Sequence, residues 1–162
     1  MKSKPAYRKK TRELLMRIVF QMMSTGDFSD AARDAFLADT SLYIGNVRED
    51  APPGCIFDEA ADEAPDLPYL NWAFACLRDH LGEIDCVISQ ASEKWSVKRM
   101  GIVDLAILRL AASELLYMED IDDSISVNEA VLMAHKYGSE KSPAFVNGIL
   151  GAIARANNGA GA

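Results

Sequence analysis

Apolar residues recur along the chain at the three- and four-residue spacing of amphipathic helices, and no strand-like alternation is bounded by turn residues. This pattern predicts an all-α protein. A first helix is predicted to begin at Pro5, which fits a first turn, and to end near Gly26. A second helix is predicted from Ser29, as its N-cap, towards Val47. The expected buried stripe of the first helix comprises Leu14, Leu15, Ile18, Val19 and Met22.

Residues 49–66 interrupt the helical pattern. They contain seven acidic residues, no basic residue and three prolines. Such a segment buries too little apolar surface to join a core, so it is predicted to be a long acidic surface loop. Helical spacing then returns, with one helix predicted around Leu70–Leu81, another around Ile84–Ala91, and Gly82 as the joint between them.

The stretch from Ile102 to Met118 is apolar almost all round, which predicts a helix that is buried on every side at the centre of the fold. Glu114 lies on this helix. Because a buried, unpaired carboxylate is costly, we expect it to have a structural partner. Ser126 and Glu129 form a capping box, which predicts that the next helix starts there.

The last helix is predicted to begin with Ser142 as its N-cap and Pro143 as its first helical residue, after a left-handed cap at Gly138. Residues 156–162 have no apolar anchor and are expected to fray as a flexible tail. The chain has 162 residues, of which 49% are apolar, and this suits a single domain over residues 1–155. The predicted fold is an all-α bundle of about seven helices.

Charge is segregated along the chain, although the net charge is −7. Residues 1–20 hold seven basic residues and one acidic residue, while the other 142 residues hold ten basic and 23 acidic residues. An acidic body repels a polyanion, so an anionic partner is expected to meet the basic end. The alternative is a solvated basic turn without a binding role.

The first helix carries a candidate RNA-binding face. At 100° per residue, Lys9, Glu13, Met16 and Phe20 fall on one flank, away from the apolar stripe. Cations that hold phosphates, beside an aromatic ring that can stack on a base, are typical of single-stranded RNA binding. The alternative is that Phe20 packs against the second helix and the cations are only solvated. Arg8 and Arg12 lie one turn apart at the boundary of this flank.

Patterns of catalytic residues are absent from the sequence. It has no phosphate-binding glycine loop, no serine nucleophile elbow and no HExxH zinc motif. Cys76 and His80 lie one turn apart, but Cys76 flanks an apolar stripe, where burial raises the pKa of a thiol and makes it less reactive. No enzyme activity, cofactor or metal is therefore predicted. The odd number of cysteines, three, favours reduced thiols in a cytoplasm.

Several blocks of this sequence resemble the NusB family of transcription antitermination proteins. The basic start Arg8–Glu13, followed by Phe20, is similar to the N-terminus of that family. The other matching blocks, in the family's order and spacing, are Asp104–Leu116, Val127–Val131, Ala134–Gly138 and Phe145–Leu150.

The resemblance implies a bundle of two helical subdomains that binds boxA-type single-stranded ribosomal RNA leaders together with NusE, a ribosomal protein of the small subunit. It also implies that the complex promotes read-through by RNA polymerase. By position, Asp104 faces the basic ribosomal partner. The implied RNA-binding residues are Lys2, Arg8, Lys9, Lys10, Arg12, Phe20, Lys141, Ser142 and Phe145.

This sequence departs from the family pattern in the last block. Lys141 stands where an acid is frequent, which strengthens attraction to phosphate, and Ala144 stands where a lysine usually precedes Phe145. Asn147 and Gly148 are interpreted as packing residues, because glycine lets two helices approach closely.

Three other functions are compatible with parts of the pattern. A protein-only helical adaptor with an incidental basic N-terminus is the main alternative. NusB-like domains also precede RNA methyltransferase modules, but no such module follows here. A DNA-binding helix-turn-helix is disfavoured, since the basic residues lie on the first helix and not on a recognition helix.

Overall fold

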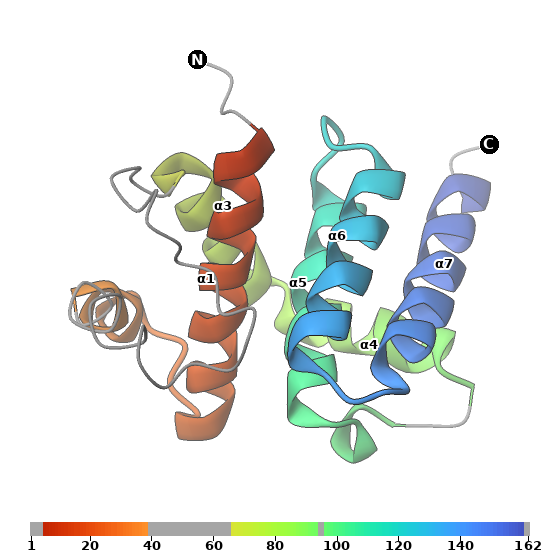
Figure 1. Cartoon of the computed structure of the whole chain (residues 1–162), viewed down its shortest axis with the longest axis horizontal. Coiled ribbons are helices and arrows are strands. Elements are labelled where there is room, and N and C mark those ends of the chain that lie inside the picture. The colour runs from red at the N-terminus through yellow and green to blue at the C-terminus, as the bar shows by residue number, and fades with distance from the viewer. Residues whose placement is uncertain (1–4, 39–65, 94–95, 161–162) are drawn as a thin grey trace. The chain divides into compact units, whose positions relative to one another are not determined.

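The computed structural model of the chain describes residues 5–38, 66–93 and 96–160. Within these ranges it contains seven α-helices, one 3-10 turn and no strand, which confirms the all-α prediction (Figure 1). The predicted continuation of the second helix towards Val47 and nearly all of the acidic segment 49–66 lie outside the described residues. The elements are α1 (Pro5–Thr25), a helix at residues 30–38, α3 (Leu67–Asp79), α4 (Leu81–Ala91), η1 (Val97–Arg99), α5 (Ile102–Tyr117), α6 (Asp123–Tyr137) and α7 (Ser142–Ala160).

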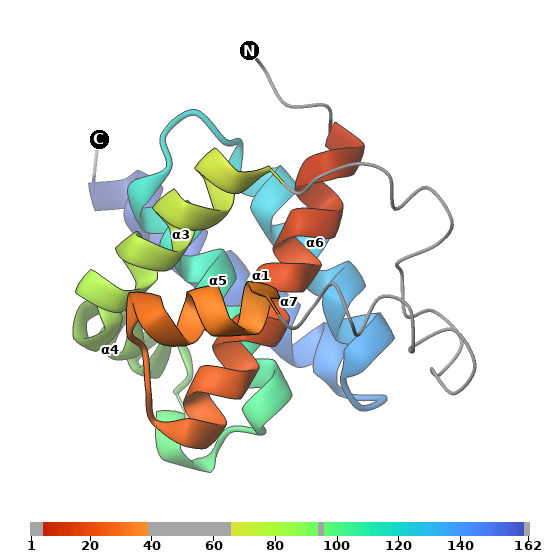
Figure 2. The same ribbon diagram turned by 90° about the vertical axis from the view of Figure 1, so that its left-hand side faces the viewer.

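The chain divides into two compact units, Met1–Leu70 and Asn71–Ala162, with the boundary inside α3. In the first unit, α1 ends where Gly26 takes a positive φ of 76° and its N–H donates to the carbonyl of Met22. The helix at residues 30–38 runs across the direction of α1 (Figure 2). Its predicted N-cap is confirmed, because Ser29 Oγ accepts a hydrogen bond from the N–H of Ala32 at 3.1 Å.

The predicted apolar stripe of α1 is confirmed. All five of its residues are at most 5% exposed, which matches the spacing of a helix that buries one face. The stripe comprises Leu14, Leu15, Ile18, Val19 and Met22.

The second unit is built around α5, as the apolar pattern predicts. From Leu105 to Leu115 every residue of this helix is buried except Arg109. Helices α4, α6 and α7 all contact α5, and α5, α6 and α7 lie side by side (Figure 1). Arg109 is half-buried and forms a bidentate ion pair with Asp85 of α4. Its Nε donates to Oδ1 at 2.8 Å and its Nη2 donates to Oδ2 at 2.9 Å, which joins these two helices. Glu114 is 1% exposed and has an interaction partner, as expected for a buried carboxylate.

Two helix boundaries differ from the prediction. The joint between α3 and α4 is His80, and Gly82 lies within the first turn of α4. Helix α6 begins at Asp123, so Ser126 is a buried residue inside the helix and the predicted capping box is wrong. The earlier start is explained by the acidic pair Asp122 and Asp123, whose negative charge suits the positive end of a helix.

Gly138 serves a different purpose from the predicted left-handed cap. Its φ is −91° and its ψ is −171°, an extended conformation that any residue can adopt. A Cβ atom at this position would lie 2.5 Å from the Cβ and Oγ atoms of Ser142 and 2.8 Å from the carbonyl oxygen of Ala134. Glycine is therefore required because the end of α6 and the start of α7 approach too closely for a side chain.

Ser142 is the first residue of α7 and not its N-cap. Its Oγ accepts a hydrogen bond from the N–H of Ser139 at 2.9 Å, and the hydroxyl group of Ser139 lies 3.1 Å away. The Ser142 side chain is thus directed back to the turn between α6 and α7, where it stabilises the short connection.

The far part of α7 also differs from expectation. The helix continues to Ala160, through most of the segment that was expected to fray. Two side-chain amides hold it: Asn157 donates to the carbonyl of Leu115 at 3.1 Å, and Asn158 donates to Asp123 at 3.2 Å. These two hydrogen bonds attach the last turns of α7, which have no large apolar residue to bury.

The interpretation of Asn147 and Gly148 as packing residues is wrong. Both are exposed on α7, and a Cβ added to Gly148 would meet no atom within 4 Å. Across the described ranges, no helix combines the length and apolar character that crossing a membrane requires.

Replacing Gly138 or Gly148 by alanine should have opposite effects on the stability of the protein. Gly138→Ala is expected to lower the free energy of unfolding by about 1–3 kcal/mol, because the new methyl group overlaps Ser142 and a carbonyl oxygen. Gly148→Ala is the matched control and should raise it by about 0.5–1 kcal/mol, since alanine replaces glycine in an open helix position. Urea unfolding followed by circular dichroism measures both. Equal effects of the two substitutions would contradict the close approach at Gly138.

Candidate nucleic-acid interface

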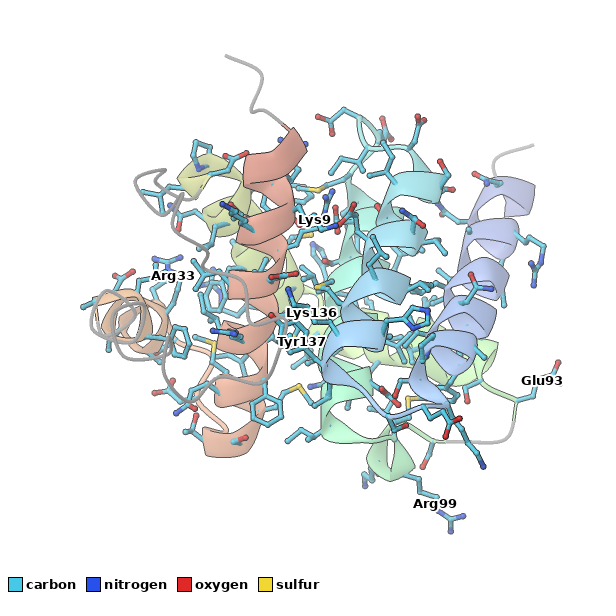
Figure 3. All side chains as sticks on the ribbon, viewed as in Figure 1. Lys9, Arg33, Glu93, Arg99, Lys136 and Tyr137 are labelled. Carbon is cyan, nitrogen blue, oxygen red and sulfur yellow. The ribbon has the colours of Figure 1, made fainter. Side chains whose placement is uncertain are left out.

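The predicted cations on α1 differ in their access to solvent. Arg8, Lys9 and Lys10 are half-buried, and the Arg8 side chain is 32% exposed. Figure 3 labels Lys9 on this helix. Arg12 is only 4% exposed. Lys2 lies outside the described residues. The first turns of α1 therefore present three accessible cations, while the fourth is held inside.

The start of α3 is joined to α1 by a hydrogen bond between the main chain of Asp66 and the side chain of Thr11. The N–H of Asp66 donates to Oγ1 of Thr11 at 2.9 Å, and Thr11 is fully buried. In turn, Oδ1 of Asp66 accepts a hydrogen bond from the N–H of Tyr69 at 3.1 Å, so Asp66 caps α3. This junction fixes the position of both Asp66 and Tyr69 beside the basic helix.

Arg8 and Arg12 both engage this junction. Nη2 of Arg8 lies 3.5 Å from Oδ2 of Asp66, whose side chain is 9% exposed. The Cζ atoms of Arg8 and Arg12 lie 5.1 and 5.5 Å from the centroid of the Tyr69 ring, within the range of cation–π attraction. Because the two arginines are one helical turn apart, one aromatic ring can hold both guanidinium groups.

Sequence reasoning missed the roles of Asp66 and Tyr69. Asp66 was assigned only to the end of the acidic loop, and it contacts a helix that is 55 positions away in the sequence. An Asp followed by Leu67-Pro68 is a helix-start signal that could have located the beginning of α3. It would not have identified Arg8 as the partner of Asp66.

The flank of α1 that was expected to stand clear of the apolar stripe is largely covered. Glu13 is 4% exposed, Met16 is 3% exposed, and Phe20 is half-buried. Burial therefore extends beyond the predicted stripe, and Phe20 is only partly available for stacking on a base.

The remaining RNA-binding candidates lie in the second unit, at the start of α7. Lys141 is exposed and Phe145 is half-buried, whereas Ser142 is 2% exposed and its hydroxyl group is engaged in the turn. The first turn of this 19-residue helix leaves N–H groups with partial positive charge, which favours an anion near Lys141.

Asp104 occupies the first turn of α5. It is half-buried, and its carboxylate lies at the positive end of the helix. Ile102, two positions earlier on the same helix, is 42% exposed and projects from a different side of it.

The residues around Cys76 and His80 form a polar cluster without catalytic geometry. Nδ1 of His80 lies 3.4 Å from Glu83, and its ring stacks on Tyr117 with the centroids 4.3 Å apart. Burial, the hydrogen bond to Glu83 and the nearby negative charges raise the pKa of Tyr117 to about 12. Burial, aided by the charge of Asp79, raises the pKa of the Cys76 thiol, as the sequence predicts. Among the described residues, no three His, Cys, Asp or Glu side chains are grouped to hold a metal ion.

Comparisons with known proteins agree on one family. Residues 9–155 match the model of the NusB family. A transcription antitermination protein NusB of Clostridium novyi is 33% identical over 150 residues, covering 92% of this chain and 98% of that protein. A protein of the same name from Alkaliphilus oremlandii is 38% identical over 144 residues, covering 89% of this chain and 90% of that protein.

Solved structures have the same fold. NusB of Thermotoga maritima ("T. maritima NusB") superposes with a TM-score of 0.70 at 30% identity, covering 96% of this chain and 93% of that one. The antitermination factor in a complex of NusB and NusE with double-stranded RNA superposes with a TM-score of 0.72 at 23% identity, over 94% of this chain and 99% of that one. This last likeness concerns the fold.

The raised pKa of Cys76 predicts slow alkylation. Iodoacetamide at pH 8 should label the half-buried Cys76 several-fold more slowly than the exposed Cys86, because its raised pKa leaves less of its thiol as thiolate. Peptide mass spectrometry over a time course measures each site, and labelling in urea should remove the difference. Equal rates in the folded protein would show that Cys76 is an accessible, reactive thiol.

Proposed function

The chain belongs to the NusB family, and we propose that it is a non-catalytic transcription antitermination factor. In this role it binds boxA-type single-stranded RNA of ribosomal leaders together with NusE, in the cytoplasm, and assists read-through by RNA polymerase. The family match over residues 9–155 and the names of the relatives support this role.

The observation that carries RNA binding is the set of three accessible cations on α1 of an otherwise acidic chain. Arg8, Lys9 and Lys10 follow one another and are all half-buried rather than enclosed, so their charged ends can reach phosphates. The rest of the chain repels a polyanion, which restricts RNA to this basic region. Arg12, being 4% exposed, contributes positive potential and packing in place of a direct contact.

The start of α7 is the second proposed RNA contact. Lys141 supplies an exposed charge, the helix end supplies N–H groups, and Phe145 supplies an aromatic ring. Ser142 acts through the turn that it stabilises, because its side chain bonds to Ser139.

NusE is proposed to meet the surface around Asp104. The half-buried Asp104 offers negative charge that steers a basic protein towards the start of α5. RNA and NusE thus use surfaces of opposite charge.

RNA binding should depend steeply on salt. If about four phosphates are neutralised, the logarithm of the affinity should fall with the logarithm of salt concentration at a slope of about −3. In Arg8→Gln/Lys9→Gln the slope should shrink by about 1.4, and binding at low salt should weaken by about tenfold or more. Fluorescence anisotropy with a labelled boxA-like RNA measures both quantities.

The matched control for this variant is Arg99→Gln. Arg99 is an exposed cation on η1, and Figure 3 shows its side chain pointing away from the helices of its unit. Its loss should leave the RNA affinity within about twofold, because an isolated surface charge is screened. Unchanged binding in both variants would reject the basic start of α1 as the RNA face.

Association with NusE should depend on Asp104. Asp104→Asn is expected to slow association about threefold at low salt and to have little effect at high salt, as for a steering charge. Stopped-flow mixing of the two proteins, with and without nuclease, measures this rate. Glu93→Gln, which removes an exposed acid that Figure 3 shows extending outward, is the control. NusE binding that survives nuclease, combined with an absence of RNA binding, would favour the protein-only adaptor.

A further inference from the structure

An acidic side chain lies within the proposed RNA face. Oδ2 of Asp66 is 3.5 Å from Nη2 of Arg8, the half-exposed arginine that the proposed function assigns to a phosphate. A phosphate that reaches Arg8 therefore meets a second negative charge only a few ångströms away. The two anions compete for one guanidinium group.

Asp66 cannot easily swing away when a phosphate arrives. Its main-chain N–H is bonded to Thr11, which is fully buried, and its Oδ1 accepts the N–H of Tyr69. Its side chain is 9% exposed, so water screens its charge weakly.

The arginine also has a second contact beside the acid. The guanidinium group of Arg8 lies over the Tyr69 ring, 5.1 Å from its centroid, which keeps it beside Asp66. The ion pair of Arg8 and Asp66 therefore joins the start of α3 to the basic helix α1.

We propose that Asp66 is an affinity-limiting residue that weakens the hold of the basic helix on any RNA backbone. The inference rests on the proposed function. Because the carboxylate opposes phosphate whatever the base sequence, it lowers the affinity for all single strands alike. The ratio of affinities between two RNAs is unchanged, but a strand that engages only the cations is held more weakly and dissociates sooner.

The test replaces the charge of Asp66 and keeps its shape. In Asp66→Asn the helix cap is retained, since asparagine caps as well as aspartate, and the main-chain bond to Thr11 does not involve the side chain. We expect binding of both a boxA-like RNA and an oligouridylate to tighten about fivefold at low salt, the scale of one partly exposed ion pair. The salt slope should steepen by about 0.7.

Asp34→Asn is the matched control. Asp34 lies in the same unit, pairs with Arg33 at 3.1 Å on the helix at residues 30–38, and its loss changes the net charge by the same amount. Figure 3 labels Arg33 on that helix. RNA affinity of this variant should stay within about twofold of the starting protein. A fivefold gain here as well would show that net charge alone explains the effect and would overturn the inference.

Arg8→Gln separates this inference from the proposed function. If Arg8→Gln leaves RNA binding unchanged, the proposed RNA face is wrong. If Arg8→Gln weakens binding, Asp66→Asn should tighten it by the full amount only when Arg8 is present, and by a smaller factor in the Arg8→Gln background. Weaker or unchanged binding of Asp66→Asn alone, with a normal unfolding transition, would overturn the role of Asp66 and leave the RNA face intact.

Discussion

The return of the chain to its first helix at Asp66 is the contact on which the proposed RNA face depends. One hydrogen bond to Thr11 and one to Tyr69 place a carboxylate and an aromatic ring against two arginines of the same helix. Two like charges one turn apart repel each other, and the ring and the acid offset that repulsion. The resulting surface has a smaller effective charge than the local excess of six basic residues in positions 1–20 indicates.

The second unit follows a different constraint, close packing around an apolar helix. Helix α5 is buried from Leu105 to Leu115 except at Arg109, whose ion pair with Asp85 joins it to α4. The sharp connection from α6 to α7 exists because Gly138 has no side chain and Ser142 bonds back to Ser139. This connection presents Lys141 at the start of a long helix.

In the proposed function, binding depends on where charged side chains lie. RNA is restricted to a few cations by the acidity of the rest of the chain, and the acid at the start of α5 attracts a basic protein partner. Binding strength is thereby set by which charges are accessible and which are already paired.

The sequence by itself determined the helical class, the buried stripe of α1, the central helix and the basic N-terminus, because these depend on local spacing and composition. It misjudged the start of α6 and the purpose of Gly138, where neighbouring elements and not local preference decide the outcome. Only the tertiary structure distinguished the accessible Arg8 from the enclosed Arg12 and brought Asp66 to both the helix and the ring. Contacts between residues more than fifty positions apart leave no periodic trace in a sequence, since they arise from how helices pack and not from how each one forms.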